Sequence, residues 1–344
     1  MRPAILGGLA ALLLALFLLR LMIGSVSIPL SDVIHVLLGG ETSKASWTQI
    51  VRDFRMPHAL TAVLAGASLS IAGLMMQTLF RNPLAGPFVL GVSSGASLGV
   101  ALVVLSAGTV GGTLLAGIGF GVDLSIAFAA SAGAALTLFV VVFIARSVQG
   151  AMTLLIVGLM VGYLTSALVS LLLYFSIPEQ IQAYVRWTFG SFGGVTWREM
   201  RILAPVTLAG LALAFSLSKS LNALLLGEGY ARSMGLNVQR ARTGIVVSTA
   251  LLAGAVTAYC GPIGFVGIAV PHLARSLFNT SDHRILFPAT TLLGAIVALT
   301  AALIAQMPGT QTILPLNPIT AMLGAPVVIW VILRQRNIQR AMEP

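Results

Sequence analysis

Long runs of apolar residues dominate this sequence and leave few folds open to it. A helix of roughly 20 apolar residues crosses the hydrocarbon core of a bilayer, and the 344-residue chain holds about ten such runs. Only 8% of the residues are charged, whereas about a quarter are charged in a soluble domain. The runs are continuous rather than alternating with period two, which predicts helices and not a barrel. We therefore expect an all-α, polytopic membrane protein in which residues 1–344 form a single transmembrane domain.

The predicted membrane helices number about ten. They cover residues 4–24, 58–79, 90–107, 123–145, 151–175, 200–216, 243–260, 262–277, 285–306 and 317–334. The first run is longer than the apolar core of a secretory signal, so we interpret it as an uncleaved helix. The eighth run begins at Gly261-Pro262, which breaks the apolar stretch, and it is short for a full crossing.

The basic residues predict the orientation. With the N-terminus inside, twelve Lys and Arg residues fall in inner loops and tails, six fall outside, and Arg20 completes the total of 19. Cytoplasmic loops carry the excess of Lys and Arg, so the sequence predicts an N-in, C-in topology. The net charge of +10 comes from singly scattered residues without a basic stripe, and we expect no nucleic-acid partner.

Three connecting segments are too polar to be spans. Residues 25–57 form an outer segment of mixed charge, and residues 176–199 have the aromatic content of a short helix at the outer interface. Residues 217–242 form the longest inner loop, in which glycines separate two possible short helices. We expect this loop to lie on the inner face of the membrane.

No catalytic constellation stands out in the sequence. It lacks a paired-carboxylate site, a Cys/His cluster and a phosphate-binding loop, so we expect no catalytic residue, no metal site and no enzyme activity in this chain. Cys260 is the only cysteine and reads as a packing residue. The spans also contain few of the ionisable residues that ion-coupled transporters place at mid-membrane. A stand-alone channel or secondary carrier remains the alternative to an externally driven transporter, and a membrane enzyme ranks third.

Several motifs occur in an order that resembles one known family. Residues 55–58 read Arg-Met-Pro-His, residues 80–87 read Phe-Arg-Asn-Pro-Leu-Ala-Gly-Pro, and residues 323–330 read Leu-Gly-Ala-Pro-Val-Val-Ile-Trp. Between them, residues 261–275 run from Gly-Pro-Ile-Gly to His-Leu-Ala-Arg, and Asp-His-Arg follows at 282–284. The chain resembles the FecCD-type permeases of binding-protein-dependent ABC importers, the family of the vitamin B12, ferric-siderophore and haem permeases.

The resemblance implies a multi-pass protein of the bacterial inner membrane that imports an iron-siderophore, haem or cobalamin-type substrate. It implies a homodimer in membrane lipid, two ATP-binding cassette subunits, and a periplasmic or lipid-anchored substrate-binding protein. ATP and Mg would bind to the partner ATPase, and this subunit would hold no cofactor. Iron-siderophores and haem are the commoner family substrates, so the resemblance favours them over cobalamin.

The resemblance also assigns residues to docking of the binding protein. Arg55 matches an outer-face arginine that pairs with an acidic residue of the binding protein, and a guanidinium suits such a forked contact. The family usually has a second arginine where this chain has His58, and Arg52 is a nearby replacement. A third basic position of the family is Gln306 here. The alternative for Arg55 is a plain interfacial anchor.

Two further assignments concern the inner face. Asn82 and Leu84 match a turn at the cytoplasmic mouth of the path, and Ala151 and Met152 match an inner gate, where an apolar constriction excludes water. The 217–242 loop matches the segment that couples to the ATPase, through Leu221, Leu224, Leu225, Gly227, Glu228, Arg232 and Gly235. We expect the three leucines to form one apolar ridge for a groove on the ATPase. The alternative is an amphipathic loop on the membrane surface.

Overall fold

The regular structure of this chain is helical throughout the described residues. The computed structural model describes residues 2–40, 42, 44–105, 122–147, 151–306 and 313–340. Apart from one isolated bridge between Gln306 and Ile313, that part of the chain contains only helices, turns and irregular segments. Helices occupy all ten predicted segments: α1 (Arg2–Met22), α4 (Met56–Leu79), α5 (Val92–Val104), α7 (Val122–Ser147), α8 (Ala151–Tyr174), α10 (Trp197–Ser216), α13 (Val238–Cys260), α14 (Val266–Phe278), α15 (His283–Ala305) and α16 (Leu316–Arg340). The predicted all-α class is confirmed.

Seven helices in the described residues are long and apolar enough to cross a membrane. They are α1, α4 with the turns before it, α7, α8, α10, α13 and α15. The apolar helices α5 and α14 have 13 residues each, which gives a rise of about 20 Å against a hydrocarbon core of about 30 Å. The apolar part of α16, Leu316–Trp330, is also short. Ten complete crossings therefore stay a prediction.

Short helices connect the long ones. They are α2 (Leu30–Leu37), α3 (Ala45–Gln49), the π-helical η1 (Ile50–Arg55), the 3-10 turn η2 (Pro87–Leu90), α9 (Pro178–Thr188), α11 (Ser218–Leu225) and α12 (Glu228–Ser233). The expected short helix within 176–199 is α9, and the two expected within 217–242 are α11 and α12. The wide turn η1 lies directly before Pro57, whose ring nitrogen has no hydrogen to donate along a regular helix.

Helix α4 is the centre of the packing. Of its apolar window 83% is buried, and it contacts α15, α13, α14 and α10. Glycines allow the closest approaches. A Cβ on Gly66 would collide with the carbonyl oxygen of Gly294 in α15, and one on Gly73 would collide with that of Gly267 in α14. Small residues at helix crossings are typical of membrane proteins, where van der Waals packing holds helices together.

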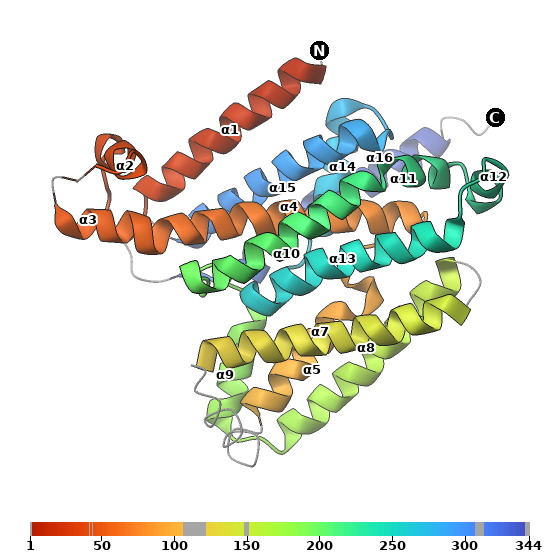
Figure 1. Cartoon of the computed structure of the whole chain (residues 1–344), viewed down its shortest axis with the longest axis horizontal. Helices are drawn as coiled ribbons and strands as arrows, with labels where there is room; N and C mark the ends of the chain where they lie inside the picture. Colours follow the sequence, from red (N-terminus) through yellow and green to blue (C-terminus); the bar gives the residue numbers. More distant parts are fainter. Residues whose placement is uncertain are drawn as a thin grey trace.

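A second group of helices packs against α13. Figure 1 shows α5, α7 and α8 on the side of α13 away from α1 and α15. Helices α5 and α7 contact α13, and α8 packs on α5 and α7. Gly95 and Gly133 bring α5 and α7 into backbone contact. Only 22% of the apolar window of α8 is buried within the chain, so most of this helix presents apolar side chains outward.

The long helices share a common direction and give the molecule two distinct ends (Figure 1). The start of α1, the end of α16, and helices α11 and α12 lie at one end, called here the α11 end. Helices α2, α3 and α9 lie at the opposite end, called here the α9 end.

Candidate functional site

The segment at residues 217–237 packs its leucines inward. Leu221 and Leu224 on α11 are buried, and α11 contacts α15 and α4. This corrects the expectation of a single exposed ridge of three leucines, because two of them fill the groove between α11 and the bundle. Apolar side chains are nevertheless exposed on this segment, namely Leu225, Leu226, Tyr230 and Met234.

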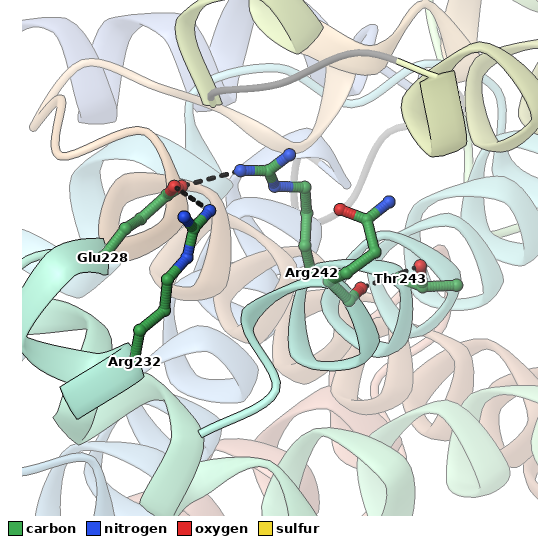
Figure 2. A network of polar contacts seen from close by, with 5 residues as sticks. Glu228, Arg232, Arg242 and Thr243 are labelled. Atoms are coloured by element: carbon green, nitrogen blue, oxygen red, sulfur yellow. Dashed lines mark hydrogen bonds and ion pairs between the residues drawn. The ribbon is translucent and has the colours of Figure 1, made fainter. Parts of the chain in front are cut away.

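Glu228 links α12 to α13 through an ion pair (Figure 2). Its Oε1 accepts a hydrogen bond of 2.8 Å from Arg242, whose side chain is 3% exposed. Arg232 lies 3.9 Å from the other carboxylate oxygen and is largely solvated. Gly227 and Gly235 bound α12 with φ of 105° and 83°, a region that glycine adopts without strain. Among the predicted coupling residues, Glu228 therefore fixes the shape of the segment, and Arg232 extends outward.

Asn222 joins α11 to the start of α15. Its Nδ2 donates to Asp282 Oδ1 at 2.7 Å, and its Oδ1 accepts from the backbone N–H of His283 at 2.9 Å. The Asp282 carboxylate caps α15 by accepting from the N–H of Arg284. These two hydrogen bonds lower the pKa of Asp282, the backbone bond having the larger effect. The charged carboxylate thus anchors α11 to α15.

The α4 turn, defined as residues 80–86, is held in a single shape. The side chain of Asn82 accepts from the N–H of Leu84 at 2.9 Å, as Asn does in tight turns. His272 of α14 contacts the carbonyl oxygen of Pro83 at 2.8 Å, which joins α14 to this turn. Leu84 is exposed at the tip of the turn.

The second pair of predicted gate residues lies at the start of α8. Met152 is exposed, whereas the side chain of Ala151 lies outside the described residues. Helix α8 packs on η2, the segment that follows the α4 turn, because a Cβ on Gly158 would collide with the carbonyl oxygen of Val89. Helix α8 and the α4 turn are therefore both connected to η2, and the gating role of the two pairs stays a prediction.

Arg55, at the α9 end, is turned into the protein. The residue is 5% exposed, and its guanidinium donates at 2.7 Å to the carbonyl oxygens of Leu21 and Met22 and also to that of Val26. The last carbonyls of a helix lack partners within it and favour a cation, so Arg55 caps the end of α1. Arg52, three residues earlier, is exposed.

A cavity of about 620 Å³ opens beside Arg55. Its described lining contains three arginines, Arg20, Arg55 and Arg186, together with His58, and no carboxylate. Gln306, the residue at the third basic position of the resembled family, also lines it. Arg20 is buried, and its Nε has no hydrogen-bond partner among the described residues. The arrangement favours an anionic group in the cavity.

Sequence reasoning missed four residues of these regions. Asn222 and His283 are hydrogen-bonded to each other although they lie 61 positions apart in the chain. No local sequence pattern pairs them. Arg20 and Arg186 entered the sequence analysis only through the count of basic residues, Arg186 among the six on the outside. Among the residues that the structure describes, no three His, Cys, Asp or Glu side chains gather to hold a metal ion.

Comparison with known proteins identifies relatives over nearly the whole length. The model of the FecCD transport family matches residues 12–334. The chain is 37% identical to the vitamin B12 import system permease protein BtuC of Klebsiella pneumoniae, over 96% of this chain and 93% of that one. It is 35% identical to the protein of the same name from Citrobacter koseri, over 87% of each chain.

A solved structure shows the same fold. It is described as an inward-facing conformation of a metal-chelate type ABC transporter. The match has a TM-score of 0.83 and 29% sequence identity, and it covers 96% of this chain and 99% of the other. The arrangement of helices around α4 is therefore shared with a transporter of known structure.

Proposed function

The chain belongs to the FecCD transport family, and from that premise we propose that it is the membrane-spanning subunit of a binding-protein-dependent ABC importer. It carries substrate across the bacterial inner membrane while separate subunits bind Mg and hydrolyse ATP. Support comes from the full-length match to vitamin B12 permeases and from the lack of a phosphate-binding loop in this sequence, which fits ATP hydrolysis on a separate subunit.

The substrate we propose is a cobalamin. The relatives named above are all vitamin B12 import permeases, whereas the sequence alone favoured iron-siderophores and haem. The solved relative is described as a metal-chelate transporter, and cobalamin is itself a metal chelate. This preference replaces the earlier one because it rests on full-length identity and not on how common each substrate is within the family.

The proposed assembly is a homodimer with two ATPase subunits at the α11 end and a binding protein at the α9 end. The exposed residues Leu225, Leu226, Tyr230 and Met234 offer an apolar contact to an ATPase groove. The basic cavity beside Arg55 suits an acidic side chain of a binding protein. The outward apolar face of α8 is available to lipid or to the second copy. Ten crossings, with both termini inside, complete the proposed arrangement.

Reconstitution in liposomes tests the function. The chain is assembled with an ATPase subunit and a binding protein of the same bacterium. Uptake of radiolabelled cyanocobalamin into the liposomes is followed with the binding protein outside and ATP enclosed in the lumen. We expect uptake that requires ATP, the ATPase subunit and the binding protein together. A matched ATPase variant that binds but does not hydrolyse ATP serves as the control. Uptake that proceeds at the same rate with this control, or without any ATPase, would establish a stand-alone carrier or channel instead.

A further inference from the structure

A chain of buried hydrogen bonds runs from α11 into the bundle. The Asn222 side chain on α11 contacts Nδ1 of His283 at 2.7 Å. On the other side of the imidazole, Nε2 lies 2.9 Å from the hydroxyl of Thr78 on α4. His283 is 1% exposed, so this single ring joins three helices, α11, α15 and α4, away from water.

The partners of the ring define its protonation. The Asn222 Oδ1 atom already accepts the backbone N–H of His283, and an amide oxygen only accepts, so Nδ1 carries the proton. In the neutral ring Nε2 is then an acceptor, and the one hydrogen of the Thr78 hydroxyl is shared between Nε2 and the carbonyl oxygen of Leu74, 3.0 Å away. The ring also packs against Phe287, with centroids 5.7 Å apart. The imidazole is therefore held in one tautomer and one orientation.

Thr78 leads directly to the α4 turn. It lies in the last turn of α4, and its carbonyl oxygen accepts the N–H of Arg81 at 3.3 Å, while that of Gln77 accepts the N–H of Asn82 at 3.2 Å. The Gln77 side chain is itself held by Arg275 at 2.7 Å. A displacement of this last turn of α4 therefore moves the backbone that forms the α4 turn.

The α12 segment approaches the same turn from outside. The Nη1 atom of Arg81 lies 3.5 Å from the position that a Cβ on Gly227 would take. The segment of α11 and α12 thus meets the α4 turn both through the buried bonds and at the surface. A shift of this segment is therefore expected to move the α4 turn as well. Elements joined by packing and buried polar contacts move together from one packed arrangement to another.

We propose that Asn222, His283 and Thr78 form a relay that couples the position of α11 to the conformation of the α4 turn. The inference rests on the proposed function in one respect, which is that the ATPase moves α11. The three side chains are positioning residues, since their contacts are with one another and with the backbone. Through the relay, a movement of α11 driven by ATP opens or closes the passage beside Leu84.

Hydrogen exchange on the purified subunit tests the relay without any transport. Asn222→Ala is expected to speed exchange of the Asn82 and Leu84 amides about tenfold, within the usual range of coupling between sites. Lys219→Ala, on an exposed position of the same helix, is the control and leaves these amides unchanged. If Asn222→Ala speeds exchange only within α11, the relay is wrong, whether or not the chain is an importer.

A matched pair at Thr78 tests the relay during transport. Thr78→Val keeps the volume and removes the hydroxyl, whereas Thr78→Ser keeps the hydroxyl. In liposomes containing the complete complex, we expect cyanocobalamin uptake per ATP hydrolysed to fall about tenfold for the valine variant and to stay within about twofold of wild type for serine. A purely structural role would reduce uptake and hydrolysis in proportion, and an unchanged ratio in the valine variant overturns the proposal.

Discussion

At the scale of single residues, sequence and structure disagree most about which way a side chain faces. The motif containing Arg55 and the leucine pattern of α11 were both visible in the sequence. The sequence did not reveal that Arg55 caps α1 or that Leu221 packs inside the chain. An amphipathic pattern shows that one face is apolar, but it does not identify what covers that face. The covering element is set by contacts distant in sequence.

Removing the cap on α1 should destabilise the protein. Arg55→Gln takes donors away from the carbonyl oxygens of Leu21, Met22 and Val26, and buried acceptors left without donors cost about 1–3 kcal/mol. Thermal unfolding in detergent measures the loss. Arg52→Gln, at an exposed position three residues earlier, should change stability by less than about 0.5 kcal/mol. Equal stability of the two variants would contradict the capping role.

The basic cavity gives a separate prediction about docking. Arg186 lines the cavity but is exposed, so reversing its charge tests docking without disturbing the cap. Arg186→Glu should slow association of the binding protein about tenfold at low salt and weaken the salt dependence, because exposed charges act mainly on the association rate. Arg198→Glu is the control, as Arg198 is also exposed but does not line the cavity. Equal association rates for both variants would remove the cavity from the docking surface.

The ion pairs in Figure 2 predict that loss of Glu228 costs more stability than loss of Arg232. Glu228→Ala removes the carboxylate bonded to the buried Arg242, which should cost about 1–3 kcal/mol of stability. Arg232→Gln removes only a solvated partner and should cost at most about 0.5 kcal/mol. Chemical unfolding of both variants checks the order. A larger effect for Arg232→Gln would show that α12 is held by the exposed pair.

At the scale of elements, the sequence located helices better than it located their first residues. The start of α13 was predicted at 243 and lies at Val238, where the side chain of Asn237 accepts from the N–H of Arg240. The start of α10 was predicted at 200 and lies at Trp197, after a capping box formed by Thr196 and Glu199. Hydropathy detects only the apolar part of a helix, whereas capping residues extend it through a polar first turn.

The crossings of α4 predict which glycines tolerate a side chain. Gly73→Ala places a Cβ against the backbone of Gly267, and forcing atoms into a packed contact typically costs about 1–3 kcal/mol. Gly8→Ala in α1, where no atom lies within 4 Å of the new Cβ, should be neutral or slightly stabilising because alanine favours helix. Protein level in membranes and thermal unfolding measure both. A stable Gly73→Ala protein would mean that α4 and α14 can separate freely.

At the scale of the whole molecule, the positions of the chain ends limit the number of crossings. Helix α1 begins and α16 ends at the same end of the bundle (Figure 1), so we expect an even number of crossings. Seven helices in the described residues are long and apolar enough to cross, and seven is odd. We therefore predict that at least one further segment crosses, and the apolar helices α5, α14 and α16 are the candidates. Hydropathy does not identify which of these helices crosses, because a short helix can complete a span with irregular backbone that is buried in protein.

The final prediction concerns the side of the membrane on which the α11 end lies. The segments assigned to the inside hold twice as many basic residues as those assigned to the outside, twelve against six among the 19 Lys and Arg residues. This excess predicts that α11 and α12 lie in the cytoplasm. The sole cysteine, Cys260, is buried, so Cys260→Ala gives a cysteine-free background. In that background, Ser233→Cys should react with a membrane-impermeant maleimide only in inverted vesicles. Thr196→Cys, exposed at the opposite end, should react only in spheroplasts. Labelling of Ser233→Cys from outside in intact spheroplasts would reverse the topology and remove the ATPase from α11.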